Sequence, residues 1–426
     1  MTILVFLGAL IGAMALGIPI AYALLVSGMA LMWHLHLFDP QILAQNLIEG
    51  ANSFTLLAVP FFLLAGEIMN VGGLSRRIVD LALAVVGHVR GGLGYVAIVA
   101  SCLLASLSGS AVADAAALTA LLLPMMIKAG HDRARSAGLL AAGGIIAPII
   151  PPSIGFVIFG VAANVSITRL FLAGIVPGLL IGAALWATWW WLSRRERMPV
   201  PPRKSRAEVR RALRESAWAM VLPLIILVGL RFGVFTPTEA AVVAAVYALF
   251  VATVVYREMK LSQLYRVFVS AAKTTAVIMF LVAAALVSSW LITVAQIPQQ
   301  VVTLLQPFIG SQTLLMIAVM VLVMAVGTAM DMTPTILILT PVLMPVVKAA
   351  GIDPVYFGVL FIINNAIGLI TPPVGTVLNT VAGVGRVKMD EVTRGMLPFM
   401  WAEFAMMFLM VLFPQLVTVP AKWFIN

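Results

Sequence analysis

Long apolar runs separated by short polar loops dominate the pattern of this chain. Two of the runs, 170–192 and 274–297, contain no charged residue. Each reaches the ~20 residues that a membrane-spanning helix needs. The apolar residues are continuous and do not alternate with polar ones, as they would in a membrane β-barrel. The pattern therefore predicts an all-α, polytopic membrane protein.

Two apolar segments are too long for one ordinary span and too short for two full ones. They cover residues 94–127 and 311–347, and small polar residues interrupt each of them in its middle. We predict that each segment is a re-entrant helical hairpin, with tips at 108–110 and 327–334. Such a tip is tolerated at membrane depth only where protein or water surrounds it.

Two further apolar segments each contain a double proline, Pro151-Pro152 within 136–165 and Pro372-Pro373 within 356–381. Proline has no N–H and its ring clashes with the carbonyl four residues back, so we predict a broken helix in each segment. In hydrocarbon each freed carbonyl is costly unless a cation, water or another segment takes it. The carbonyls expected to lose their helical partners are those of Gly144, Ala147, Pro148, Gly368 and Leu369.

The hairpins and broken helices belong to an internal repeat. Basic residues flank the first hairpin on both sides, whereas only Lys348 lies beside the second, so the positive-inside bias predicts that the two halves are inverted. Asp114 and Asp331 correspond at a slightly shorter offset than the other matches. Six matches share one offset: Pro124 with Pro345, Gly130 with Gly351, Asp132 with Asp353, Pro151-Pro152 with Pro372-Pro373, Gly174 with Gly395, and Pro177 with Pro398.

The predicted domain organisation follows from these elements. Hairpin and broken helix together make each repeat a candidate transport unit, and the remaining helices form a scaffold. The N-terminus lacks the basic stretch and cleavage site of a signal peptide, so we expect a retained first helix. The expected units are N-terminal scaffold helices (1–93), the first repeat (94–192), a basic cytoplasmic linker (193–215), further scaffold helices (216–297), and the second repeat with a C-terminal helix (298–426).

Composition and charge narrow the choice of partners. Charged residues make up only 10% of the chain, against roughly 25% in soluble proteins. The net charge of +10 would suit nucleic acid, but nine of the 26 basic residues lie between Arg194 and Arg214, and none lies within 1–75. That distribution is typical of cytoplasmic membrane loops, so the expected partner is the lipid bilayer and no nucleic acid. The single Cys102 excludes an internal disulfide.

Oxygen atoms gather at the predicted tips and breaks, and they are our candidate ligands. Helix C-terminal ends and freed carbonyls favour cations, N-terminal ends favour anions, and hard oxygen ligands suit Na⁺. The predicted sodium ligands are Ser106, Ser108, Gly144, Ala147, Pro148, Ser153, Thr328, Asp331, Asn365, Gly368, Thr371 and Thr376. The predicted substrate contacts are Ser110, Asp114, Asn364 and Asn379.

Several charged residues have a second interpretation. Asp114 and Asp331 lie near the start of a hairpin arm, where a carboxylate also caps a helix. Glu239 follows Thr236-Pro237 as in a capping box, which favours a capping role over an ion ligand. For Glu67, Lys273 and Glu403 the pattern favours interfacial or packing roles. Arg386 and Arg394 could contact a substrate carboxylate, but the positive-inside bias of cytoplasmic loops is the simpler explanation for them.

Other chemistries find no motif in the sequence. The four histidines show no metal-ligand spacing, and no Gly-x-x-x-x-Gly-Lys-Ser/Thr loop is present for ATP. We therefore expect that the protein is not an enzyme, that it needs no cofactor, and that it binds no metal besides Na⁺ as the coupling ion. A membrane-embedded enzyme or a non-transporting scaffold remains a weaker alternative, since an enzyme needs a convergent acid–base or metal site, and a scaffold needs no helix breaks.

Five motifs resemble the large membrane subunit of tripartite ATP-independent periplasmic (TRAP) transporters, especially its 2,3-diketo-L-gulonate and sialic acid branches. They cover essentially the whole chain: Phe61–Glu67, Leu107–Asp114, Ala147–Ser153, Gly327–Asp331 and Ile370–Gly375.

That resemblance implies a Na⁺-coupled importer in the bacterial inner membrane. A periplasmic binding protein would deliver an organic acid such as a sugar acid, sialic acid or dicarboxylate, and a small membrane subunit would complete the scaffold. The two repeats would move as an elevator, with Na⁺ at each junction of hairpin and broken helix and the substrate between them. A stand-alone ion-coupled organic-anion symporter is the alternative.

Overall fold

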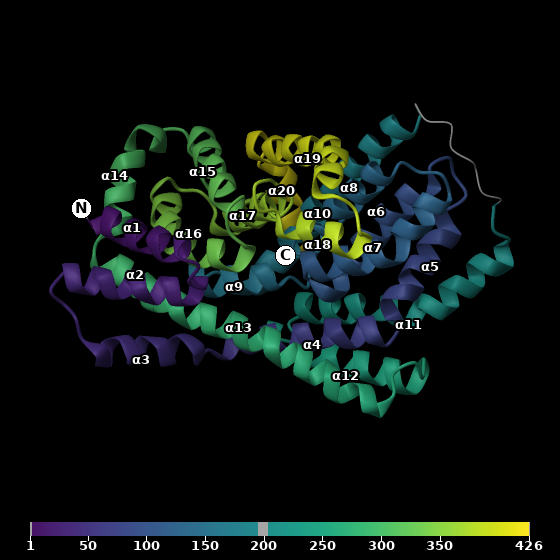
Figure 1. Cartoon of the computed structure of the whole chain (residues 1–426), viewed down its shortest axis with the longest axis horizontal. Helices are drawn as coiled ribbons and strands as arrows, with labels where there is room; N and C mark the ends of the chain where they lie inside the picture. Colours follow the sequence, from purple (N-terminus) through teal and green to yellow (C-terminus); the bar gives the residue numbers. More distant parts are fainter. Residues whose placement is uncertain (1, 195–202, 426) are drawn as a thin grey trace.

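The computed structural model describes residues 2–194 and 203–425, and within them the chain contains helices and no strand (Figure 1). Eight of these helices are long and apolar enough to cross a membrane. The all-α membrane fold predicted from the apolar runs is confirmed. Residues 195–202 of the predicted basic linker lie outside the described residues.

The N-terminal part forms short apolar helices. Residues 2–34 form two helices separated at Gly17, which has a positive φ. The elements are α1 (Thr2–Ala15), α2 (Ile20–His34), α3 (Pro40–Ala51), the 3₁₀ turn η1 (Phe54–Leu57), α4 (Ala58–Val71) and α5 (Leu74–Val86).

Both halves of the repeat have the same order of elements: a hairpin, a broken helix and a long helix. The first half comprises α6 (Gly92–Ser108), α7 (Ala111–Lys128), α8 (Arg133–Gly144), α9 (Ile154–Ala163) and α10 (Ile167–Ser193). The second comprises α15 (Gln312–Gly327), α16 (Met332–Ala349), α17 (Pro354–Gly368), α18 (Thr376–Gly385) and α19 (Met389–Leu412), followed by α20 (Gln415–Ile425).

Local geometry at matched positions agrees with the repeat. Gly130 and Gly351 both have a positive φ. Asp132 and Asp353, two residues after them, are the N-caps of α8 and α17, and each side chain accepts a hydrogen bond from a backbone N–H of the first turn. The hairpin tips and both helix breaks lie where the sequence predicts them.

The segment between the repeats contains α11 (Arg206–Arg231), α12 (Pro237–Phe250), the π-helical turn η2 (Val251–Val255), α13 (Leu261–Val294) and α14 (Ile297–Ile309). The predicted linker is helical from Arg206 onwards, because Ser205 and Glu208 form a capping box there. Helix α13 contacts α2, α3, α4 and α16 and so connects the N-terminal helices to the second hairpin.

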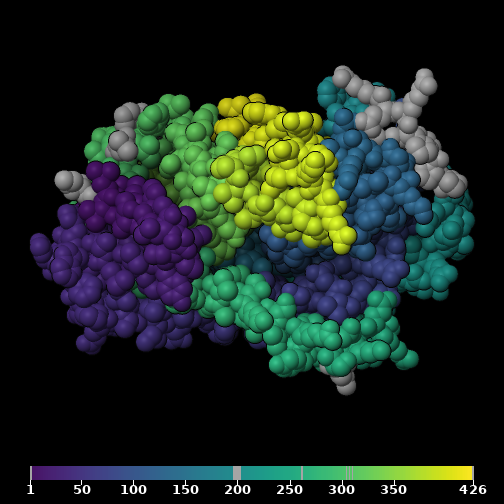
Figure 2. All heavy atoms as spheres, viewed as in Figure 1, coloured from purple at the N-terminus to yellow at the C-terminus, as the bar shows by residue number. Residues whose placement is uncertain are grey.

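The two halves interlock. Helix α8 of the first half packs against α19 of the second, α7 packs against α18, and α9 packs against α16. Helices α4, α12 and α13 lie along the lower edge of the molecule in Figure 1, away from α8 and α19 at the top. The space-filling view shows the surface hollowed between the yellow C-terminal helices and green α13 (Figure 2).

Replacing Thr236 by alanine tests the predicted capping box of α12. The Thr236 side chain accepts a hydrogen bond from the Glu239 N–H at 3.3 Å, and the Glu239 carboxylate accepts one from the Thr236 N–H at 2.8 Å. Loss of an N-cap costs about 1 kcal/mol. We expect Thr236→Ala to lower the thermal unfolding midpoint of the purified protein. Thr303→Ala, in the middle of α14, removes a threonine that caps no helix and should leave the midpoint unchanged.

Candidate functional site

The first hairpin tip rests directly on the first helix break. Gly109, between α6 and α7, has φ +63°, and a Cβ built on it would collide with the carbonyl oxygen of Pro152. The same Cβ would lie 3.2 Å from Cα of Ser153. Ser153 is the N-cap of α9, where its Oγ accepts from the Phe156 N–H at 3.1 Å. Only a glycine at the tip allows this close approach.

Asp114 is the buried acid of the first junction. Its side chain is 3% exposed, and Oδ1 accepts a hydrogen bond from the Ser108 hydroxyl. Oδ2 is buried and has no hydrogen-bond partner among the described residues. The side-chain cap of α7 is Ser110, whose Oγ accepts from the Ala113 N–H at 3.4 Å. Asp114 therefore keeps one carboxylate oxygen available beside the tip.

The second hairpin tip also contacts its helix break. The Val374 N–H donates to the Thr328 carbonyl at 3.3 Å, so tip and break share a backbone hydrogen bond. A Cβ built on Gly368 would lie 2.9 Å from the carbonyl carbon and oxygen of Gly327. Asp331 occupies the N-cap position of α16 but caps no N–H; its Oδ1 accepts from the Thr376 hydroxyl at 3.4 Å. The junctions of both halves are thus built alike.

Asn365 is the buried amide of the second junction. Its Nδ2 donates to the Met332 carbonyl at 3.1 Å. Its Oδ1 is buried without a partner in the described part of the chain and faces Gly327, whose built Cβ would lie 3.4 Å away. The neighbouring Asn364 is also fully buried, but it points towards α15 and donates to the Met320 carbonyl. The two adjacent amides therefore serve different interfaces.

Four of the five carbonyls expected to lose their helical partners accept hydrogen bonds from other donors. None of these bonds comes from the backbone N–H four residues later, so the predicted break in the helical pattern is confirmed. The acceptors are Gly144, Pro148, Gly368 and Leu369, which take hydrogen bonds from Ala147 N, Ser153 Oγ, Thr371 N and Val377 N at 3.2, 2.6, 3.0 and 3.0 Å. Tight turns after each half-helix, and the N-cap serine, supply these donors. For Ala147 we find no donor among residues 2–194 and 203–425.

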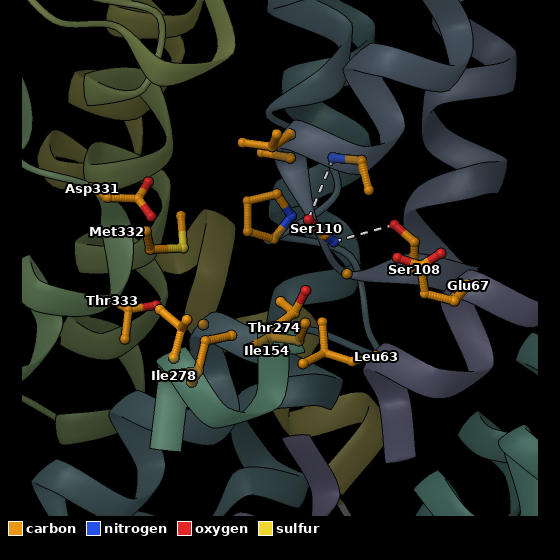
Figure 3. A pocket seen from close by; sticks show the side chains of 18 of the residues that line it. Leu63, Glu67, Ser108, Ser110, Ile154, Thr274, Ile278, Asp331, Met332 and Thr333 are labelled. Atoms are coloured by element: carbon orange, nitrogen blue, oxygen red, sulfur yellow. Dashed lines mark hydrogen bonds between the residues drawn. The ribbon is translucent and has the colours of Figure 1, made fainter. Parts of the chain in front are cut away.

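A cavity of about 630 Å³ lies between the two hairpin tips and helices α4 and α13 (Figure 3). In Figure 3, Asp331, Met332 and Thr333 stand on one side, and Ser108, Ser110 and Glu67 on the other. The residues that line it are Leu63, Gly66, Glu67, Asn70, Ser108–Ala113, Ala116, Pro148, Ile154, Gly155, Ala271, Lys273, Thr274, Val277, Ile278, Asp331–Thr333 and Leu369.

The structure separates the predicted ligands into groups. Ser108, Ser110, Pro148 and Asp331 line the cavity. At the junctions lie Asp114, Gly144, Ala147, Ser153, Thr328, Asn365, Gly368 and Thr376. The remaining four predicted ligands donate hydrogen bonds to backbone carbonyls. Three bond to carbonyls three to five residues earlier: Ser106 to Leu103, Thr371 to Ile367 and Asn379 to Val374. Asn364 bonds to Met320 of α15.

The sequence pattern did not predict that α4 and α13 form a wall of the cavity. Glu67 and Lys273, for which a packing or interfacial role was favoured, both line the cavity. The Glu67 carboxylate accepts from the Ser270 hydroxyl at 3.1 Å, which joins the two helices. A signal was present, because Ser270, Lys273 and Thr274 repeat at helical spacing within a largely apolar run and so share one face.

Helix N-termini add partial positive charge to the wall of the cavity. Helices α7, α9 and α16 all begin at its wall, with Ala111, Ile154 and Met332 among the lining residues. The N-terminus of a helix carries a partial positive charge and unpaired N–H groups, so it favours anions. Together with the Lys273 ammonium, these three helix ends make the cavity suitable for a carboxylate.

Similarity to known proteins agrees with this geometry. Residues 7–416 match the family model described as the DctM component of the tripartite ATP-independent periplasmic transporter. The chain belongs to the DctM family. It is 57% identical, over 99% of its length and 100% of the relative's, to the 2,3-diketo-L-gulonate TRAP transporter large permease protein YiaN of Escherichia coli. It is 38% identical, over 95% of both chains, to the sialic acid TRAP transporter large permease protein SiaM of Vibrio cholerae.

A solved transporter structure has a similar fold. The YdaH transporter of Alcanivorax borkumensis superposes with a TM-score of 0.67, covering 90% of this chain and 88% of that one, at 15% identity. At that identity the likeness concerns the fold alone. The family resemblance inferred from the sequence motifs is confirmed. The chain is a large permease subunit of the TRAP transporter family.

Proposed function

We propose that this chain is the large subunit of a Na⁺-coupled importer of organic acids in the bacterial inner membrane. The observation that carries the proposal is the arrangement of two tip-and-break junctions around one cavity. Each junction holds a buried oxygen that has no donor among the described residues, and the helix N-termini of α7, α9 and α16 lie at the cavity between them. Cation sites beside an anion site are what a Na⁺/carboxylate symporter requires.

The cation sites lie at the two junctions. At the first, the Asp114 Oδ2 atom and the Ala147 carbonyl supply oxygen ligands. At the second, the Asn365 Oδ1 atom faces the close approach of Gly327 and Gly368. All are hard oxygen donors, which suit Na⁺. Binding Na⁺ would satisfy buried polar atoms that otherwise remain unpaired, which favours occupancy.

An elevator motion is the transport step that fits this arrangement. The tips and breaks form one wall of the cavity, and α4 and α13 form the other. Helix α4 approaches the first tip closely at Gly66, whose built Cβ would lie 3.6 Å from Cα of Ser108. The hairpins and broken helices therefore move as one body past α4 and α13 and carry the substrate with them.

Two partners complete the transporter. A periplasmic binding protein delivers the acid, and a small membrane subunit joins the scaffold; both follow from membership of a tripartite family. The most similar relative named above transports 2,3-diketo-L-gulonate by its name, and the other sialic acid. We assign this chain an organic acid as substrate on that basis. A stand-alone symporter is the second candidate, because the cavity and both junctions lie within this one chain.

Uptake into proteoliposomes tests the proposal. The chain is reconstituted alone, with its small subunit, and with candidate binding proteins, and labelled sugar acids and dicarboxylates are offered under an inward Na⁺ gradient. We expect uptake that requires Na⁺ and both partners. Uptake by the chain alone would establish the stand-alone symporter. Uptake that proceeds equally with K⁺ in place of Na⁺ would refute sodium coupling.

A further inference from the structure

The polar groups of the cavity are unevenly balanced in charge. Lys273 is the one basic side chain among the described residues that line it, whereas two carboxylates, Glu67 and Asp331, face the same space. The other polar lining groups are neutral hydroxyls and one amide, at Asn70. A ligand that fills this cavity therefore meets one cationic side chain, two anionic ones and many neutral groups.

Lys273 is available to a ligand. It lies on α13 with an exposed side chain, and it forms no ion pair within residues 2–194 and 203–425. Glu67 on α4 accepts a hydrogen bond from Ser270, which lies one turn before Lys273 on α13. The ammonium has three donors and no acceptor, so it can donate hydrogen bonds to a carboxylate that enters the cavity.

The two carboxylates exclude one class of ligand and favour another. A dicarboxylate would place its second negative charge near Glu67 or Asp331, and like charges side by side in an interface are strongly unfavourable. Carboxylate oxygens accept hydrogen bonds, so Glu67 and Asp331 can each accept one from a donor on the ligand. The hydroxyl groups of a sugar acid are such donors.

We propose that the cavity selects a monocarboxylic acid that carries several hydroxyl groups. Lys273 and the N-terminus of α7 hold its carboxylate, and Glu67 and Asp331 accept hydrogen bonds from its hydroxyls. This inference rests on the proposed function, in which the cavity is the substrate site. Because a site built to pair with hydroxyls leaves its own polar groups unpaired when they are missing, an acid without hydroxyls is rejected.

Ligand-induced thermal stabilisation of the purified full-length chain, in detergent with Na⁺, tests the inference. The probes are gluconate and 2-ketogluconate as hydroxylated monocarboxylates, hexanoate as a monocarboxylate without hydroxyls, and succinate as a dicarboxylate. We expect one of the hydroxylated acids to bind at least roughly tenfold more tightly than hexanoate and succinate. Tighter binding of succinate, or no response to any acid while Na⁺ itself still stabilises the chain, would overturn the inference.

Three variants assign the residues. Lys273→Gln should weaken binding of the hydroxylated acid at least roughly tenfold, as expected for loss of a charge-assisted hydrogen bond. Glu67→Gln should reduce the preference over hexanoate and leave hexanoate binding itself unchanged. Lys348→Gln, at the far end of α16, is the matched control and should change neither. Unchanged acid affinity in Lys273→Gln would refute its role, whereas Na⁺-driven uptake of a dicarboxylate would refute this inference and leave the proposed function standing.

Discussion

Replacing Gly109 by alanine is expected to lower Na⁺-driven uptake at least ~100-fold, the scale of loss caused by displacing binding groups by about an ångström. Two effects add at this position. A side chain at φ +63° is strained by roughly 1–2 kcal/mol, and the new Cβ would overlap the Pro152 carbonyl oxygen. The tip of the first hairpin must then move away from the break, and Ser108 and Asp114 move with it. Initial uptake rates in proteoliposomes measure the loss.

Gly130→Ala is the matched control. Gly130 has φ +85°, similar to Gly109, but a Cβ built on it meets nothing within 4 Å. The variant therefore carries the backbone strain without the steric overlap, and it lies at the end of the same hairpin arm. We expect uptake to stay within about threefold of the unaltered chain, since the strain of roughly 1–2 kcal/mol lowers the stability of the fold but displaces no binding group. Equal losses in both variants would show that the contact of tip and break is not what matters.

The break and tip positions could be predicted because they depend on local chemistry. Proline ends a helix through its missing N–H and its ring, whatever surrounds it. Small polar residues at 108–110 likewise interrupt an apolar run. Helix α7 begins at Ala111, and α9 begins at Ile154, directly after Ser153. These features needed no knowledge of tertiary contacts.

The hydrogen bonds inside the breaks could not be predicted in the same way. The double prolines do free carbonyls from the helical pattern, but tight turns recapture them, as Ala147 does for Gly144. Which carbonyl stays without a donor depends on the path of the chain through the turn. Ala147 was one of several carbonyls that the sequence offered as ligands, and the structure distinguishes it from the others because it has no donor among the described residues.

The sequence did not predict the wall that α4 and α13 form, because this wall depends on tertiary contacts between segments far apart in the chain. Glu67 and Ser270 lie 203 positions apart and meet only when α4 and α13 pack together. In the sequence each is a single polar residue in or near an apolar segment, for which an interfacial place is the simpler interpretation. Only the fold shows that α13 packs against α4 and α16 and brings Lys273 into the wall of the cavity.

Asn365→Ala is expected to raise the Na⁺ concentration for half-maximal uptake at least roughly tenfold, because the variant removes an oxygen ligand to a charged ion. The Asn365 Oδ1 atom is fully buried, has no donor in the described part of the chain, and faces the backbone contact of Gly327 with Gly368. A buried acceptor of this kind is costly unless a cation occupies the site. The Na⁺ dependence of uptake in proteoliposomes measures the change.

Asn364→Ala separates a cation ligand from an ordinary buried amide. Asn364 and Asn365 are adjacent and equally buried, each donates to one methionine carbonyl, and each has an unpartnered Oδ1. Loss of either amide should lower stability by a similar amount, since each leaves a buried carbonyl unpaired. Only Asn365 faces the tip of the second hairpin, so only its loss should shift the Na⁺ dependence. A shift in Asn364→Ala with none in Asn365→Ala would place the second cation between α15 and α17 instead of at the junction.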